Sequence, residues 1–288
     1  YMKKTLRMGD LLELDAPSVQ HRLKVIIDSK NLVLENVYNQ EPLSYDEIME
    51  WCRSQAEFFK DYICDVGTLL GAAADQGKNI LFEAQLGALR DIDYGIYPFT
   101  SSSNTIASYA PIGAGIPGRA LDNVVGVMKA YSTCVGEGPF AAEKAMGEAW
   151  NEKLRESGGE FGAATGRPRR VGPFDAVASR YGIRCQKAQD IALTKLDVLG
   201  AFDKIPVITG YRLHGVLLDS FPTDSRLEEA EPVIEELPGW GCDISGCRSW
   251  KELPENARKY VCTLEKLVDH PIYLVSTGAE RDAYLLRE

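Results

Sequence analysis

The stretch of this sequence best suited to chemistry is residues 158–170, where glycines and arginines are concentrated. Glycine lets backbone N–H groups approach a ligand closely, and an arginine guanidinium offers paired donors that match carboxylate or phosphate oxygens. Arg167, Arg169 and Arg170 all lie here, although the chain carries a formal net charge of −10. The composition predicts a pocket for a small anion, and the alternative is a solvated basic turn.

Two further polar segments follow short apolar runs of the kind that form buried parallel strands. Residues 194–197 (Thr-Lys-Leu-Asp) come after the run 191–193, and residues 276–278 (Ser-Thr-Gly) come after the run 272–275. In an open α/β sheet, ligands bind at the carboxyl ends of such strands. Both segments are therefore placed to meet a ligand.

The residue types in these segments favour guanine as that ligand. The Asp197 carboxylate can accept two parallel hydrogen bonds from the N1–H and 2-amino groups of guanine, which adenine cannot offer. The stem of Lys195 can lie along the base, and backbone N–H groups of residues 276–278 can donate to the 6-oxo oxygen. The alternative is a salt-bridged strand end.

A guanine nucleotide also needs a phosphate-binding loop, and the nearest match to one is residues 71–79. The spacing of Gly71 and Gly77 is too long, and no Ser or Thr follows Lys78. The segment also leads from a helix into an apolar run, whereas anions bind where a helix begins. We therefore predict a helix-ending turn.

Carboxylates and hydroxyls gather in a second region. Asp91 and Asp93 are spaced as a carboxylate pair for acid–base work, but turn residues anchoring a long loop are the favoured interpretation. The hydroxyl run at residues 100–103 offers donors suited to a phosphate, although such runs are commonly plain loop.

The overall composition narrows the class of protein. Hydrophobic residues make up 45% and charged residues 26%, as in soluble globular proteins, and no apolar run reaches the roughly 18 residues of a membrane span. The acidic balance argues against a nucleic-acid binder. The seven scattered cysteines and the lack of a secretory signal favour reduced thiols in the cytoplasm. No histidine lies at ligand spacing from Cys242 and Cys247, so we expect no zinc.

Hydrophobic periodicity divides the chain into a helical subdomain, residues 9–78, and an α/β part, residues 79–288. Short apolar runs alternate with helices in the second part, which predicts an α/β fold with a mostly parallel central sheet. In the first part, Ser44 and Glu47 have capping-box spacing. The expected helices are 19–28, 44–75 with a break, 139–157, 174–181 and 253–270, and the expected strands are 80–82, 124–131, 191–193, 205–208, 272–275 and 283–286.

Several motifs occur in a fixed order along the sequence. They are Asp91-Ile92-Asp93, Tyr97-Pro98, Ser102-Ser103-Asn104, Lys129-Ala130-Tyr131-Ser132-Thr133, Val135-Gly136, Gly138-Pro139-Phe140, residues 160–170, residues 194–199, Pro238-Gly239-Trp240, and Ser276-Thr277-Gly278 with Arg281. In kind and order they resemble the adenylosuccinate synthetase family along nearly the whole chain. The resemblance implies a P-loop-NTPase-like α/β fold without its N-terminal segment. That segment would hold the phosphate-binding loop, the Mg²⁺ ligands and the catalytic Asp and His, so we expect the chain alone to be inactive.

The resemblance also implies roles for individual residues. The residues expected to bind aspartate are Ala163, Ala164, Thr165, Gly166 and Arg167. Those expected to bind IMP are Gln85, Ser101, Val135 through its carbonyl, and Arg167. Those expected to bind GTP are Arg169, Lys195, Leu196, Asp197, Ser276, Thr277 and Gly278.

The implied activity is the GTP-dependent ligation of L-aspartate to IMP, which yields adenylosuccinate, GDP and phosphate on the way to AMP. GTP, with Mg²⁺ as cofactor, phosphorylates the 6-oxygen of IMP, and the aspartate amine then displaces the phosphate. Both transition states gather negative charge, which fixed arginine donors stabilise. The implied partners are IMP, L-aspartate, GTP and a second copy of the chain in a cytoplasmic homodimer, with no nucleic acid and no membrane.

Three departures from the family pattern keep alternatives open. Residues 83–87 read Glu-Ala-Gln-Leu-Gly where the family has Glu-Gly-Ala-Gln-Gly, which shifts Gln85 by one position. Tyr94 replaces a common His, and Pro168 interrupts the arginine run. The alternatives are a paralogous ligase that acts on another purine nucleotide and a non-catalytic guanine-nucleotide-binding fragment.

Overall fold

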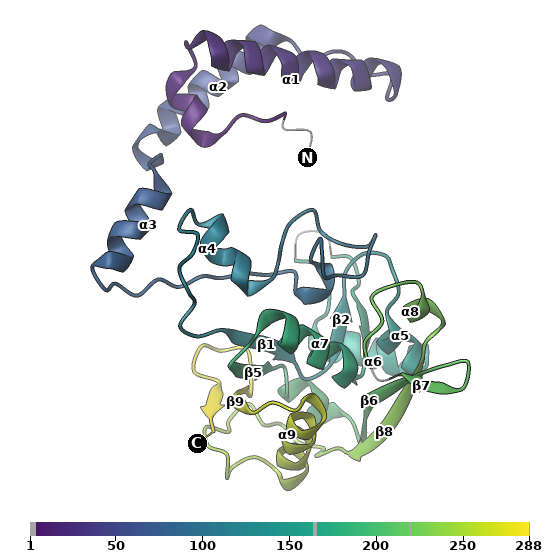
Figure 1. Ribbon diagram of the computed structural model, residues 1–288. Coiled ribbons are helices and arrows are strands. Elements are labelled where there is room, and N and C mark those ends of the chain that lie inside the picture. The colour runs from purple at the N-terminus through teal and green to yellow at the C-terminus, as the bar shows by residue number, and fades with distance from the viewer. Residues whose placement is uncertain (1–3, 164–165, 219, 288) are drawn as a thin grey trace. The chain divides into compact units, whose positions relative to one another are not determined.

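The computed structural model describes residues 4–163, 166–218 and 220–287. The chain forms two compact units (Figure 1). The helical unit comprises the residues up to Ile80 together with Ala114–Ile116, and the α/β unit comprises Leu81–Gly113 together with the residues from Pro117 onward. No helix of the described residues is long and apolar enough to cross a membrane.

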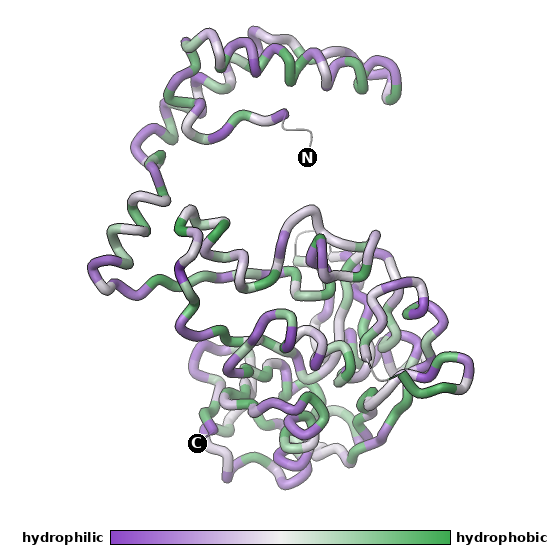
Figure 2. Tube along the Cα trace, in the orientation of Figure 1, coloured by the Kyte–Doolittle hydropathy of each residue, from purple (hydrophilic) through white to green (hydrophobic). Residues whose placement is uncertain are grey.

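The helical unit is built on an amphipathic pair of helices. Its elements are η1 (Met8–Glu13), α1 (Pro17–Asn36), α2 (Tyr45–Phe59), η2 (Lys60–Tyr62) and α3 (Val66–Asp75). Val19, Leu23 and Ile27 recur on one face of α1 and pack against Met49 and Cys52 of α2. Figure 2 shows hydrophobic and hydrophilic residues alternating along these helices. Helix α1 runs eight residues beyond the predicted end at Asp28, because no Gly or Pro interrupts it there.

Local capping sets the boundaries of the next two helices. Ser44 Oγ accepts a hydrogen bond from the Glu47 N–H (3.4 Å), which confirms the predicted start of α2. The helical stretch is interrupted after η2. Helix α3 then begins after Asp65, whose side chain caps it by accepting a hydrogen bond from the Thr68 N–H (3.1 Å). Helix α3 ends at Asp75, and Gly77 has φ +71°. Residues 71–79 are therefore a helix-ending turn, as predicted.

The central sheet of the α/β unit has the order β1-β5-β9-β10. Strand β5 (Asp190–Thr194) pairs in parallel with β1 (Val125–Lys129) on one side and with β9 (Ile272–Ser276) on the other, and β10 (Tyr284–Leu286) is antiparallel to β9 (Figure 1). This confirms the predicted α/β fold with a mostly parallel central sheet. Ile191, Leu193 and Val275 are fully buried, which explains why these strands are continuous apolar runs.

Two smaller sheets complete the unit. Strands β2 (Ser132–Cys134) and β3 (Arg170–Gly172) form an antiparallel pair. Strand β6 (Lys204–Leu213) pairs in parallel with β4 (Phe174–Asp175) and antiparallel with β7 (Val216–Leu218) and β8 (Glu231–Pro238).

The helices of the α/β unit pack on these sheets or connect them. They are η3 (Ala88–Arg90), η4 (Ala107–Tyr109), α4 (Ala110–Gly113), α5 (Ala141–Ala145), α6 (Glu148–Gly158), α7 (Ala176–Gln186), η5 (Asp197–Ala201), α8 (Arg226–Glu229) and α9 (Glu255–Val268). Tyr260, Val261 and Leu264 of α9 belong to the same buried cluster as Leu193 and Val275. The predicted helix at residues 253–270 is thus the amphipathic cover of the central sheet.

Two sequence-based assignments in this unit were wrong. Residues 80–82 form no strand, and Leu81 is 94% exposed, so the apolar triplet has no sheet to join in this structure. The predicted helix at residues 139–157 is two helices, α5 and α6, which meet at Met146 and Gly147. Met146 has extended backbone geometry (φ −126°, ψ 163°), a break that composition alone did not indicate.

Gly172 gives a direct test of how β3 is packed. A Cβ at this position would lie 2.1 Å from the backbone oxygen of Ala142, and backbone cannot yield as a flexible side chain can. Gly172→Ala is therefore expected to lower the free energy of unfolding by about 3 kcal/mol, measured by urea denaturation. Gly246→Ala is the control, because a Cβ there meets nothing within 4 Å. Equal stability of the two variants would contradict the packing.

Candidate functional site

The carboxyl ends of three parallel strands meet at one edge of the central sheet. Lys129, the last residue of β1, pairs with Thr194 at the end of β5, and Leu193 pairs with Val275, one residue before the end of β9. The predicted guanine-binding segments therefore leave the sheet from neighbouring strands. The fold brings together what the sequence separates by about eighty residues.

The segment after β5 turns sharply at Lys195. This lysine has φ +63°, and its Nζ donates a hydrogen bond to the Gly158 backbone oxygen (3.0 Å), at the end of α6. Leu196 is fully buried, so any contact that it makes with a ligand would come from its backbone. Asp197 opens η5 and is partly exposed, which leaves a carboxylate at the sheet edge.

The segment after β9 is a tight loop with much of its bonding capacity already used. Ser276 Oγ donates to the Gly278 backbone oxygen (2.9 Å). Thr277 is fully buried; its Oγ1 donates to the Cys247 backbone oxygen (3.1 Å) and its N–H to the Ala283 backbone oxygen (2.8 Å). Thr277 thus shapes the loop, and the half-buried Ser276 and Gly278 are the residues that can face a ligand.

The glycine–arginine loop is closed at its base like a short hairpin. Helix α6 ends at Gly158, and Gly159 is left-handed (φ +60°), as the sequence predicted for a helix end. The backbone N–H of Arg169 donates to the backbone oxygen of Glu160 (2.9 Å), and the backbone N–H of Gly162 donates to the backbone oxygen of Arg167 (2.8 Å). Of the residues expected to bind aspartate, Ala163, Gly166 and Arg167 are described, and Ala164 and Thr165 lie outside the described residues.

Pro168 fits this hairpin without strain. It lies opposite Phe161 in an antiparallel bridge, between the two backbone hydrogen bonds given above. In such a non-hydrogen-bonded pair the N–H is not used, so a proline, which lacks one, costs nothing there. The interruption of the arginine run is therefore compatible with a closed loop.

A buried carboxylate, Glu160, connects this loop to the sheet. Its side chain is 1% exposed and accepts from Lys129 Nζ (2.8 Å), Tyr131 OH (2.6 Å) and Arg169 NH1 (2.8 Å). Burial by itself raises the pKa of the Glu160 carboxyl, but these donors together outweigh it and lower the pKa. Glu160 is therefore a charged acceptor between two cations.

The lowered pKa of Glu160 predicts how stability depends on pH. Because the folded-state pKa lies below the unfolded value, near 4.3, the stabilisation is present at neutral pH and is lost as the pH falls through the folded-state pKa. The difference in unfolding free energy between the wild type and Glu160→Gln should narrow between pH 7 and pH 3. Glu156→Gln, an exposed change of equal charge in the same part of the chain, is the control. A difference that stays constant across this range would argue against a paired carboxylate.

Two of the residues expected to bind IMP are joined by Arg90. Its backbone oxygen accepts from the Ser101 N–H (2.7 Å), and its NH2 donates to the Val135 oxygen (2.9 Å). Ser101 Oγ also lies 2.7 Å from Ser103 Oγ. Arg170 stabilises the segment after Val135, because it donates to the Gly138 oxygen (2.8 Å) and forms an ion pair with Glu143 (2.6 Å).

The third residue expected to bind IMP, Gln85, is placed differently. It is exposed and lies in residues 81–86, which form no helix or strand. The predicted strand that would have fixed it at a sheet edge is absent there. No helix or strand carries Gln85, whereas hydrogen bonds with Arg90 hold Ser101 and Val135.

Asp91 is a loop anchor, as the favoured interpretation predicted. Its carboxylate is fully buried and accepts from the N–H groups of Asp93 (2.9 Å), Tyr94 (3.0 Å) and Thr105 (2.6 Å). Burial raises its pKa, but the backbone donors outweigh burial and the net pKa is lowered. Asp93 accepts from Asn104 (2.8 Å). The pair holds the long loop.

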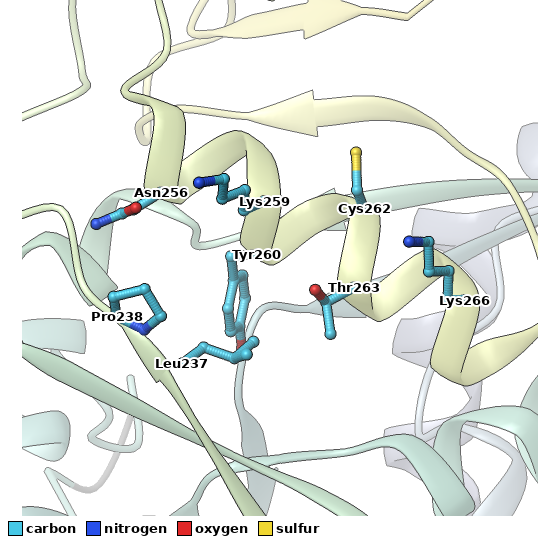
Figure 3. A pocket seen from close by; sticks show the side chains of 8 residues that line it. All are labelled: Leu237, Pro238, Asn256, Lys259, Tyr260, Cys262, Thr263 and Lys266. Atoms are coloured by element: carbon cyan, nitrogen blue, oxygen red, sulfur yellow. The ribbon is translucent and has the colours of Figure 1, made fainter.

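Two hollows of the α/β unit lie apart from the predicted guanine and aspartate loops, and Tyr94 of the Asp91 loop lines the second of them. One hollow, of about 250 Å³, lies between β8 and α9. The side chains that line it are shown in Figure 3: Leu237, Pro238, Asn256, Lys259, Tyr260, Cys262, Thr263 and Lys266. Another, of about 360 Å³, is lined by Tyr94, Ile106, Ser108, Tyr181, Arg184 and Cys185. In the part of the chain that the structure describes, no group of three or more His, Cys, Asp or Glu residues could hold a metal ion. The candidate site is instead an open sheet edge flanked by loops.

Comparison with known proteins identifies the family of this chain. A family model described as adenylosuccinate synthetase matches residues 1–285. The chain belongs to the adenylosuccinate synthetase family. Adenylosuccinate synthetases of Pelobacter propionicus and Trichlorobacter lovleyi are 44% and 46% identical over 285 residues, or 99% of this chain. The chain spans 65% of the length of each of these relatives.

A solved structure supports the same family. The fully ligated adenylosuccinate synthetase of Plasmodium falciparum matches with a TM-score of 0.90 and 32% identity. The match covers 99% of this chain and 67% of that one. The α/β fold with helices and a mostly parallel central sheet is therefore the fold of adenylosuccinate synthetases.

Sequence reasoning missed part of the candidate adenylosuccinate synthetase site. Lys129, Tyr131 and Glu160 carried the family resemblance, but no role was assigned to them. The signal was a lysine near the end of a predicted strand and a glutamate at the base of a cationic loop. Only the folded chain shows that these side chains meet.

Proposed function

We propose that this chain takes part in the GTP-dependent ligation of L-aspartate to IMP, which yields adenylosuccinate, GDP and phosphate through a 6-phosphoryl-IMP intermediate. The observation that carries the proposal is the parallel pairing of β5 with β9, which brings Asp197 and the Ser276–Gly278 loop to one sheet edge. Membership of the adenylosuccinate synthetase family supports the ligase activity.

In this proposal the sheet edge holds guanine. The Asp197 carboxylate accepts from N1–H and the 2-amino group, and the Lys195 stem lies against the base plane. Backbone groups of Leu196, Ser276 and Gly278 complete the base site, and Thr277 holds their loop in shape. A carboxylate facing two donors discriminates against adenine, because adenine offers no such pair of donors and would leave the carboxylate oxygens without them.

The loops on either side hold the reacting groups. Ala163, Ala164, Thr165, Gly166 and Arg167 bind aspartate, Ser101, Val135 and Gln85 bind IMP, and Arg167 bridges the two. Arg169 reaches the GTP phosphates. Negative charge builds on the transferred phosphoryl group and then on the departing phosphate, so guanidinium donors beside them lower both barriers.

Mg²⁺ would accompany the GTP phosphates and neutralise their charge. The described residues offer no cluster of ligands for it, so no step of the proposed mechanism is assigned to a metal held by this chain. We further propose that the active assembly is a homodimer, which sedimentation velocity would test.

A direct assay tests the proposed activity. The intact protein is incubated with IMP, L-aspartate, GTP and Mg²⁺, and adenylosuccinate is detected by mass spectrometry. The matched control replaces GTP with ATP. Product in the reaction with GTP, and none in the reaction with ATP, supports the proposal. GTP binding in calorimetry without product would instead favour the guanine-nucleotide-binding fragment, and product with another purine nucleotide would favour a paralogous ligase.

A further inference from the structure

Arg169 is held by its neighbours in two separable ways. Its backbone is fixed on both sides. The backbone N–H donates to the backbone oxygen of Glu160 (2.9 Å), and the backbone oxygen accepts from Arg155 Nε (3.0 Å). Its side chain is fixed by the Glu160 carboxylate, which NH1 contacts at 2.8 Å. The position of the chain and the direction of the guanidinium therefore depend on different groups.

The guanidinium of Arg169 is only partly satisfied in this position. Its Nε is buried and has no hydrogen-bond partner among the residues described here. An unmade hydrogen bond of a buried donor is unfavourable. The side chain is nevertheless 34% exposed, so part of the fork faces solvent. Glu160 engages only one nitrogen of the Arg169 guanidinium, so the remaining N–H groups can donate hydrogen bonds to a second anion.

Glu160 is shared between two cations, so it can hold the Arg169 side chain while its single negative charge does not balance both positive charges. One carboxylate faces two cations, Lys129 at 2.8 Å and Arg169 at 2.8 Å, and Tyr131 donates a third bond. Lys195 approaches the same region through its bond to the Gly158 oxygen (3.0 Å). The cluster carries an excess of positive charge beside the sheet edge, which favours a polyanion there.

We propose that Glu160 is a positioning residue that directs the Arg169 guanidinium toward the phosphates of the bound nucleoside triphosphate. The inference rests on the proposed function, since it requires a guanine nucleotide at the sheet edge. Glu160 itself touches no substrate. It acts by restricting the rotamers of Arg169, so that less side-chain freedom is lost when the phosphates bind.

A double-mutant cycle measures this role. Glu160→Gln, Arg169→Ala and the double variant of the full chain are titrated by calorimetry with GTP and separately with guanosine, which has no phosphates. Glu160→Gln keeps the side-chain volume but removes the charge that attracts Arg169. We expect it to weaken GTP binding about tenfold in the otherwise unchanged chain, to have no effect in the Arg169→Ala background, and to leave guanosine binding unchanged.

Glu143→Gln is the matched control, because Glu143 pairs with the neighbouring Arg170 (2.6 Å) and its effect should be equal with and without Arg169. Equal loss of GTP affinity from Glu160→Gln in both backgrounds, or a parallel loss of guanosine affinity, would overturn the positioning role. Tighter GTP binding would overturn it as well, because Glu160 would then compete with the phosphates. If the unsubstituted chain binds neither ligand, the proposed function itself is refuted.

Discussion

Asp197→Asn is expected to lower the affinity for GTP about a hundredfold and to leave the fold intact. In the proposed base site the carboxylate accepts two charge-assisted hydrogen bonds, and the amide would keep one acceptor and turn a donor toward the 2-amino group. Hydrogen bonds to charged groups contribute about 1.5–3 kcal/mol, which corresponds to this loss. Asp197 is partly exposed, so its replacement leaves no buried charge unpaired.

The same substitution should change the preferred base, which makes the test specific. Xanthine carries an oxygen where guanine carries the 2-amino group, and the new amide can donate to it. Calorimetry with GTP and with xanthosine triphosphate should therefore show opposite changes. Asp203→Asn is the control, because it removes an exposed carboxylate just beyond η5. Unchanged GTP affinity in Asp197→Asn would refute the guanine assignment.

Arg167→Ala is expected to lower kcat/KM for aspartate by about two to three orders of magnitude. In the proposed mechanism its guanidinium bridges aspartate and IMP, and removal of one donor that stabilises developing charge costs about 10²–10³ in rate. The backbone of this residue is held independently of its side chain, because its oxygen accepts from the Gly162 N–H (2.8 Å). The loop should therefore keep its closed base in the variant.

Initial rates at varied aspartate concentration check this expectation. A rise in KM with little change in kcat would mean that Arg167 contributes only to aspartate binding, whereas a fall in both kcat and kcat/KM indicates a role in the transition state. Arg226→Ala is the control of equal charge; its side chain is 59% exposed and pairs with Asp224 at 2.8 Å. An unchanged kcat/KM in Arg167→Ala would remove this residue from the proposed site.

Local rules accounted for the elements that depend on nearby residues. The capping serine Ser44, the left-handed Gly159 and the apolar runs of β5 and β9 follow from propensities within a few positions, and the structure has them as predicted. The parallel pairing of β5 and β9 was expected from the alternation of helices and strands. The residues of the candidate guanine site could therefore be placed at one sheet edge before the fold was known.

What could not be predicted depends on contacts between distant parts of the chain. Residues 80–82 have the composition of a buried strand but pair with none of the described strands, and composition cannot reveal whether a partner is present. Glu160 is 31 positions from Lys129 and 29 from Tyr131, so no spacing rule connects them. Their meeting follows from the three-dimensional path of α6, which returns the chain to the end of β1.

The hydrogen bond from Lys195 to the Gly158 oxygen has a thermodynamic consequence. It joins the segment proposed to hold guanine to the end of α6, from which the loop proposed to hold aspartate begins. A ligand that orders one of them reduces the freedom that remains to be lost when the other binds. By linkage, GTP should then raise the affinity for aspartate by the same factor by which aspartate raises the affinity for GTP. One backbone carbonyl would in this way make the two binding events cooperative.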